Sequence, residues 1–164
     1  MSRIERARVY SLEEREARSV ALAQPHRMGS DSILAGTALG RFCLRWWRDE
    51  GAQREYCDVG ERYARLMDDE RSSRGLSPRQ HSENGCGLES MDHRARQEWR
   101  VRAASALQNA SDAIREVDHR AVTAIQILVY EDRDILANLE GRAYNGLYRL
   151  RVHFERVDKT RTRA

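Results

Sequence analysis

The sequence has little proline and almost no lysine, and both scarcities narrow what this chain can be. Only two prolines occur in 164 residues, and no stretch alternates β-branched with polar residues over the length of a strand. Chains with these properties are typically helical. Lys159 is the only lysine among 29 basic residues, so nearly every positive charge is a planar guanidinium suited to phosphate or carboxylate. The sequence therefore predicts an all-α fold.

Recognisable catalytic and cofactor motifs are also missing. The sequence has no dinucleotide-binding glycine motif after a strand, no Walker loop and no nucleophile elbow. His81, Cys86 and His93 could be pictured as zinc ligands, but their spacing matches no zinc finger or ribbon. Acidic runs at 68–70 and 131–134 could bind a divalent cation, and are more simply explained as helix ends or solubilising segments. We therefore expect no catalytic residue, no metal and no cofactor, and a protein that is not an enzyme.

No apolar segment is long enough to cross a membrane. The longest mostly apolar run, 121–130, is about half the length that a membrane-spanning helix needs. The charged N-terminus lacks the apolar centre of a signal peptide. Cys43, Cys57 and Cys86 are odd in number, and two lie on predicted core faces, which argues for reduced thiols. We expect a cytoplasmic protein with no membrane attachment.

A segment rich in turn-forming residues divides the chain into two helical parts. Residues 72–89 are rich in glycine and serine, include Pro78 and contain few apolar side chains. The sequence thus predicts an N-terminal helical unit (1–71), a flexible linker (72–89) and a C-terminal helical unit (90–164). Helices are expected near 12–23, from Ser30 or Ser32 to 48, and over 53–72, 90–117, 118–130, 135–140 and 142–157.

Two apolar stripes form the centre of the N-terminal unit. They comprise Ala35, Leu39, Phe42, Cys43 and Trp46 in one helix and Tyr56, Val59, Tyr63, Leu66 and Met67 in the next. This spacing is typical of core-facing helices that pack against each other. Gly51 lies between them and is expected to end the first helix. An alternative interpretation makes Trp46, Trp47 and Tyr56 the anchors of a partner-binding groove.

A narrower stripe marks the long helix that opens the C-terminal unit. It comprises Ala103, Leu107, Ala110, Ile114 and Val117. Small residues at this spacing suit either close packing inside one chain or a seam between two copies. The sequence leaves both alternatives open.

The last predicted helix has the most distinctive surface. Ala143, Leu147, Leu150 and Phe154 should dock on the core, while the opposite face carries Arg142, Asn145, Arg149, His153 and Arg156. Arginine can bind guanine edges or phosphate, and asparagine can bind adenine. A short helix, a turn at Gly141 and this helix would be compatible with a helix-turn-helix arrangement. The competing interpretation is a solvated arginine-rich face with no ligand.

The charge distribution favours the same region. The chain carries a net charge of +3, and residues 140–164 alone account for +4, with Lys159, Arg161 and Arg163 near the end. A basic C-terminus adds non-specific affinity for phosphate.

Several short motifs resemble a group of small helical proteins of unknown function from GC-rich bacteria and their prophages. They are 23–27 (Ala-Gln-Pro-His-Arg), 38–42 (Ala-Leu-Gly-Arg-Phe), 56–63 with its Gly-Glu-Arg-Tyr end, and 146–154 with its Gly-Leu start and His-Phe end. Val59 departs from the small residue usual at its position. The resemblance implies a DNA-associated or phage-regulatory setting and supplies no site residues.

These observations lead to two hypotheses. The first is a non-enzymatic DNA-binding or transcription-regulatory protein of prophage type, which contacts double-stranded DNA through Arg142, Asn145, Arg149 and Arg156. The alternative is a helical adaptor or oligomeric structural protein that acts through contacts with another protein or with copies of itself.

Overall fold

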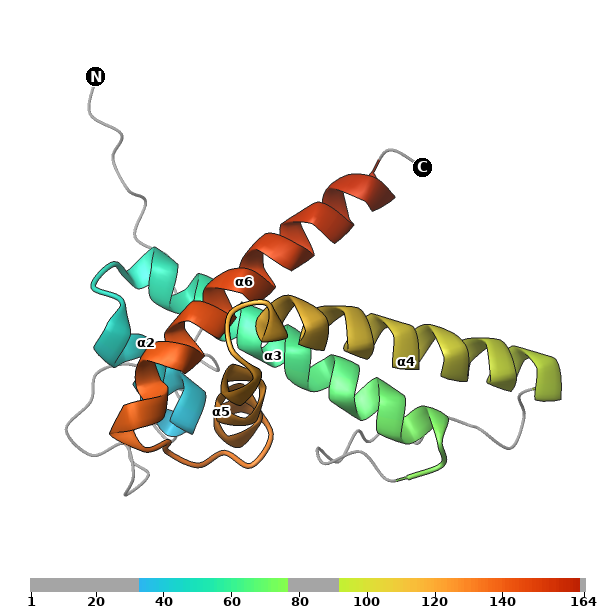
Figure 1. Ribbon diagram of the computed structural model, residues 1–164, viewed down its shortest axis with the longest axis horizontal. Coiled ribbons are helices and arrows are strands. Elements are labelled where there is room, and N and C mark those ends of the chain that lie inside the picture. Colours follow the sequence, from blue (N-terminus) through green and yellow to red (C-terminus); the bar gives the residue numbers. More distant parts are fainter. Residues whose placement is uncertain (1–32, 77–91, 163–164) are drawn as a thin grey trace, which may run out of the picture.

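The computed structural model describes residues 33–76 and 92–162 (Figure 1). All regular secondary structure in these two ranges is helical. The elements are a short 3-10 helix η2 (Ile33–Gly36) and five α-helices, α2 (Ala38–Trp46), α3 (Glu50–Ser73), α4 (His93–Arg115), α5 (His119–Val129) and α6 (Ala137–Arg161). No strand occurs in these two ranges. The predicted all-α class is confirmed. The helix expected at 12–23 lies outside the described residues, as does most of the predicted linker.

Side-chain caps fix where three of the helices begin. The Thr37 hydroxyl accepts a hydrogen bond from the Gly40 amide at 3.0 Å, and an Asp49 carboxylate oxygen accepts one from Ala52 at 2.8 Å. Asp118 likewise accepts from the Arg120 amide at 2.8 Å and begins α5. Such caps satisfy amides that have no partner within the helix. The second helix therefore begins at Ala38, later than the start at Ser30 or Ser32 that the sequence suggested.

Gly51 does not separate α2 from α3, which corrects the sequence prediction. It lies in the first turn of α3, directly after the Asp49 cap, and α2 has already ended at Trp46. The stabilisation from the Asp49 cap outweighs the modest free-energy penalty of placing glycine in a helix.

The apolar stripes of α2 and α3 face each other as predicted, with one exchange. Phe42, Cys43 and Tyr63 are fully buried, but Trp46 is 37% exposed, whereas Trp47 is only 8% exposed. The prediction that Trp46 is the inner tryptophan is therefore wrong. The extended backbone at Trp47 (φ −116°, ψ 130°) turns its indole back toward the core, where it stacks on Tyr56 with ring centroids 4.1 Å apart.

A close approach at Gly60 sets the spacing between α2 and α3. A Cβ atom on Gly60 would lie 2.6 Å from Leu39 Cδ2 and 3.2 Å from Val129 Cγ1. The first distance is shorter than real Cβ contacts and the second is unusually tight, so Leu39 would have to move if residue 60 carried a Cβ atom.

One core joins helices from both sides of the predicted linker. Tyr63 of α3 is fully buried, and its hydroxyl is 3.0 Å from the Ser111 hydroxyl of α4. The buried cluster includes side chains from each of α2 to α6. The division into two separate helical units is therefore not confirmed.

The small-residue stripe of α4 is used inside this core. Ala110 and Ile114 are fully buried and Ala103 is 6% exposed, whereas Val117 lies beyond the end of α4 and is 36% exposed. Of the two alternatives left by the sequence, close packing within one chain is the one that the structure supports.

Helix α6 lies across the other helices and projects beyond them at its C-terminal end (Figure 1). It packs against α3, α4 and α5, while α3 and α4 run side by side away from α2. The predicted break at Gly141 is wrong, because α6 runs without interruption from Ala137 to Arg161. None of the helices in the described ranges combines the length and the apolar character needed to cross a bilayer.

Candidate nucleic-acid interface

Helix α6 buries one face as predicted and thereby fixes which face is exposed. Ala143, Leu147 and Leu150 are fully buried, and Phe154 is 5% exposed. Gly146 lies on this buried face, where a Cβ atom would come 2.6 Å from Ile125 Cδ1. The tight contact with α5 prevents α6 from rotating about its axis, so the opposite face must point to solvent.

Arg142 has a structural role at the edge of that face. Its Nε donates to the Asp118 carboxylate, and its Nη1 donates to the Asn138 carbonyl at 3.3 Å. Asp118 is also the cap of α5, and the Arg120 amide, followed by the Arg142 guanidinium, holds the pKa of this carboxyl below its usual value. Arg142 thus ties α6 to the start of α5, and its guanidinium is already engaged.

Asn145, Arg149 and Arg156 are all exposed, as the sequence predicted. Within the described ranges, no acidic side chain forms a salt bridge with Arg149 or Arg156. Three of the four predicted contact residues therefore share an accessible face, and its two arginines carry positive charge that remains available.

The acidic residues of α6 form salt bridges with arginines of other helices or of a different face of α6. Glu140 lies 2.9 Å from Arg45, and Glu155 lies 3.4 Å from Arg151. Asp158 receives both terminal nitrogens of Arg62 at 2.8 Å, a two-point contact that also lowers the pKa of this carboxyl. These pairs neutralise the carboxylates of α6 away from Arg149 and Arg156.

A small pocket of about 240 Å³ lies beside these arginines, between α4 and α6. It is lined by Asn109, Asp112, Ala113, Glu116, Arg149, Val152, His153 and Arg156. Hydrogen bonds from Gln108 and Arg115 engage Asp112 and hold its pKa below the usual value. Glu116 is exposed at the same rim, so the pocket combines two arginines with two carboxylates, of which Asp112 is already engaged.

His153 lies in this pocket and is tuned by its neighbours. Burial lowers its pKa, and the positive charges of Arg62 and Arg156 lower it further, while Glu116 acts in the opposite direction. Its ring lies 5.5 Å from that of Phe154. The imidazole is therefore neutral at pH 7 and gains charge only in more acidic solution.

The exposed stripe of α6 is longer than the sequence prediction. Asn138 and Lys159 extend it at the two ends, and Tyr148 lies within it with 46% of its surface exposed. Asn138 was missed because a break was expected at Gly141. Lys159 could have been included, since it continues the helical spacing of Asn145, Arg149 and Arg156.

The helix-turn-helix arrangement is not confirmed. Residues 130–136 connect α5 to α6, a longer connection than the three or four residues usual in that motif. The expected short helix at 135–140 is absent as a separate element, because most of it forms the start of α6. The arginine face is thus presented by one long helix.

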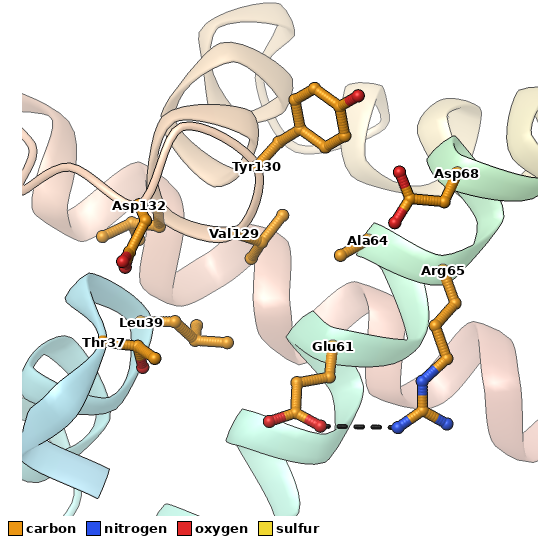
Figure 2. Close-up of a pocket in the computed structure, with 10 residues that line it drawn as sticks. Thr37, Leu39, Glu61, Ala64, Arg65, Asp68, Val129, Tyr130 and Asp132 are labelled. Carbon is orange, nitrogen blue, oxygen red and sulfur yellow. Dashed lines mark hydrogen bonds and ion pairs between the residues drawn. The ribbon is translucent and has the colours of Figure 1, made fainter. Parts of the chain in front are cut away.

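A second pocket, of about 480 Å³, lies where α2, α3 and α5 meet (Figure 2). Its lining comprises Thr37, Leu39, Glu61, Ala64, Arg65, Asp68, Leu128, Val129, Tyr130 and Asp132. Figure 2 shows Glu61 joined to Arg65, a distance of 3.4 Å. Asp132 accepts the Ala38 amide at 2.7 Å and adopts a left-handed backbone with φ 50°. Two carboxylates of the pocket are therefore already engaged in contacts within the protein.

The acidic runs considered for cation binding are likewise engaged. Asp134 pairs with Arg41 at 3.1 Å, Glu131 lies 3.3 Å from Arg133, and Glu70 pairs with Arg74. Within 33–76 and 92–162, no three histidine, cysteine or acidic side chains are grouped as a metal site requires. His81 and Cys86 of the imagined zinc set lie outside the described residues.

Comparison with known proteins adds no relative from which a function could be transferred. No family model, curated protein or solved structure matches this chain. The resemblance to small helical prophage proteins stays a prediction, and the surface of α6 is the feature from which a function can be inferred.

Proposed function

We propose that this chain is a non-enzymatic DNA-binding protein and that the exposed face of α6 contacts the duplex. One observation carries the proposal. The carboxylates of α6 are paired with arginines of other helices or of another face of α6, whereas Arg149 and Arg156 form no salt bridge with an acidic side chain within the described ranges. A protein surface that leaves arginines uncompensated along one helix face is suited to bind phosphate.

The geometry of the face supports a duplex as the ligand. From Asn138 to Lys159 the exposed stripe covers 21 helical steps, or roughly 30 Å at 1.5 Å per residue. An α-helix fits the major groove of B-form DNA. In this proposal Arg149 and Arg156 bind phosphates, and Asn145 contacts a base. Arg142 supports the site by fixing α6 against α5.

Transcription regulation in a prophage setting is the biological role that we propose for this binding. The support for it is the resemblance of the short motifs together with the charge of α6. A regulator would bind one sequence more tightly than others, and Asn145 is the residue best placed to contribute this difference through a base contact.

Binding of labelled duplex DNA, measured by fluorescence anisotropy, tests the proposal. The test variant is Arg149→Gln with Arg156→Gln, and the matched control is Arg54→Gln with Arg65→Gln, which removes two exposed arginines from α3. Substitution is better than truncation here, because α6 supplies Leu147 and Leu150 to the core.

The proposal predicts at least a tenfold loss of affinity for the test variant and a much smaller loss for the control. Equal losses in the two variants would show that binding follows net charge alone. No binding by the wild-type protein at low salt would contradict the proposal.

A second candidate function, a helical adaptor or oligomer subunit, is favoured by a different observation. Trp46 remains 37% exposed although its ring lies 5.3 Å from that of Tyr144, and Tyr148 follows one turn later on α6 with 46% exposed. Exposed aromatic rings are frequent at interface centres.

Light scattering of the purified protein tests self-association. A dimer that Trp46→Ser dissociates would support this candidate, and a strict monomer at high concentration would count against self-association.

A further inference from the structure

Two cysteines lie side by side in the core, on different helices. Cys43 of α2 is fully buried and Cys57 of α3 is 4% exposed, and both are free thiols. Each belongs to the apolar cluster that holds the two helices together. Buried thiols often serve only as small apolar side chains, so their placement relative to each other decides whether they can do more.

The packing of α2 against α3 brings these two thiols together. Leu39 of α2 rests directly on Gly60 of α3, because glycine leaves space for it. Cys43 is one turn after Leu39, and Cys57 is almost one turn before Gly60, so an antiparallel helix pair places them opposite each other. The two thiols are close enough that Cys57 affects the titration of Cys43.

We propose that Cys43 and Cys57 form a redox pair, which a peroxide converts into an intramolecular disulfide that joins α2 to α3. In the first step one sulfur attacks the peroxide O–O bond, forming a sulfenic acid and releasing water. The second thiol then attacks that sulfur and releases another water molecule. Two thiols are oxidised and one hydrogen peroxide is reduced to two waters, so atoms and electrons balance.

The contact also predicts the rate of this reaction. The hydrogen bond to Cys57, together with burial, raises the pKa of the Cys43 thiol far above its ordinary value. Little thiolate is then present at pH 7, and oxidation must follow local opening of α2. The pair should stay reduced under ordinary conditions and oxidise slowly under sustained peroxide.

The expected consequence is a more stable α2–α3 hairpin. The disulfide would close a short loop around residues 47–49, which connect the two helices. Closing such a loop restricts the unfolded chain and raises the melting temperature, provided that the native helices need not move apart. The Gly60 contact keeps these helices close, which favours an unstrained bond.

The test uses the full-length chain with Cys86→Ser, so that the pair supplies the only thiols. The protein is incubated with hydrogen peroxide below its melting temperature, unfolded, and titrated for free thiols. Digestion with trypsin cuts after Arg45, Arg48 and Arg54 and therefore separates the Cys43 and Cys57 peptides unless a disulfide joins them. Thermal unfolding of treated and untreated protein is compared.

The proposal predicts a linked peptide pair, loss of both titratable thiols at a rate independent of protein concentration, and a melting temperature higher by several degrees. A thiol reductant should reverse all three changes. Two thiols still titratable after the chain is unfolded, disulfides only between chains, or a linked form that melts lower than the reduced form would each overturn it.

Discussion

Trp46 and Trp47 are neighbours in sequence and differ sharply in their surroundings. Trp47 stacks on Tyr56 and Tyr144, with ring centroids 4.1 and 4.9 Å away, and lies almost entirely inside the core. Trp46 contacts Phe42 and Tyr144 at the edge of the same cluster and keeps more than a third of its surface in water. The two residues should therefore contribute unequally to stability.

Replacement of each tryptophan by alanine tests this difference. Trp47→Ala should lower the free energy of unfolding by about 3–5 kcal/mol, because it leaves a cavity among buried rings. Trp46→Ala should cost roughly 1 kcal/mol, since it removes a partly solvated ring contact. Urea denaturation followed by circular dichroism measures both values. Similar losses for the two variants would contradict the assignment of Trp47 as the inner ring.

His153 gives the stability a defined dependence on pH. Its pKa is lower in the folded chain than the ordinary value of about 6.5, so the unfolded chain binds the proton more readily. Its contribution is fully present above that value and is lost as the pH falls below it. The charged groups that act on it are Arg62, Arg156 and Glu116.

We therefore expect the wild-type protein to lose stability between about pH 7.5 and about pH 5.5 more steeply than His153→Asn does. The measurement is the urea midpoint of both proteins across this range. His93→Asn is a suitable control, because that ring is exposed and lies in α4. Parallel pH profiles for the wild type and His153→Asn would contradict the role assigned to His153.

At the level of residues, the sequence identified the faces better than it identified single side chains. Helical spacing correctly placed Phe42, Cys43 and Tyr63 in the core. It failed at Trp46 because a periodic pattern assumes that the helix continues, whereas α2 ends there and the extended backbone reverses which tryptophan is buried. Arg142 was likewise assigned to DNA because its partner Asp118 is 24 residues away in the chain.

At the level of elements, Asp118 links the start of α5 to the first part of α6. Its carboxylate accepts the Arg120 amide and also receives the Arg142 guanidinium. The side chain of Arg142 is 34% exposed and that of Asp118 is 23% exposed, so water screens this ion pair only in part. One carboxylate thus performs two tasks at the junction of two helices.

Substitution at this junction should separate the two tasks. Asp118→Ala removes the cap and the ion pair together and should cost about 1–2 kcal/mol of unfolding free energy. Arg142→Gln leaves the cap in place and should cost about 1 kcal/mol or less, with DNA affinity nearly unchanged. Denaturant unfolding and DNA anisotropy of the two variants test this. A loss of DNA affinity in Arg142→Gln as large as that expected for the Arg149/Arg156 variant would contradict the structural role of Arg142.

Element types could be predicted from the sequence, whereas element ends depended on details that the pattern does not contain. The inner faces of α5 and α6 follow from apolar spacing. Gly141 was expected to end a helix, but it lies in the first turns of α6, where no left-handed residue is needed and a Cβ atom would meet nothing within 4 Å. Glycine there is tolerated and does not act as a terminator.

At the level of the whole molecule, helices from both sides of residues 77–91 share one core. The contact between Tyr63 and Ser111 crosses that gap, and Gly60 packs against Leu39 and Val129 from two further elements. Such mixing couples the two halves of the chain energetically. A two-unit prediction from composition alone could not include these contacts, because they join residues distant in sequence.

We expect a single cooperative unfolding transition as a result. Tryptophan fluorescence and circular dichroism should give the same urea midpoint, and Tyr63→Ala should shift both equally, by an amount corresponding to roughly 3 kcal/mol or more. Hydrogen exchange can locate the effect. Two transitions, or destabilisation by Tyr63→Ala that remains confined to α2 and α3, would contradict a shared core.

The packing of the whole molecule also decides which charges of α6 remain uncompensated. The predicted arginine face could be anticipated from spacing on one helix, but the pairing of Glu140 with Arg45 and of Asp158 with Arg62 could not, since it depends on how α6 lies across its neighbours. This pairing is what leaves Arg149 and Arg156 available for phosphate.

The most direct measurement is the salt dependence of duplex binding by the full chain, from about 50 to about 200 mM salt. The account predicts that affinity falls steeply over this range and that Arg149→Gln with Arg156→Gln reduces the slope of log affinity against log salt by about two, because two phosphate contacts are lost. The matched Arg54/Arg65 variant should keep the wild-type slope. A slope that is unchanged in the α6 variant, or duplex binding that is absent at the lowest salt, would contradict the claim that this face of α6 binds DNA.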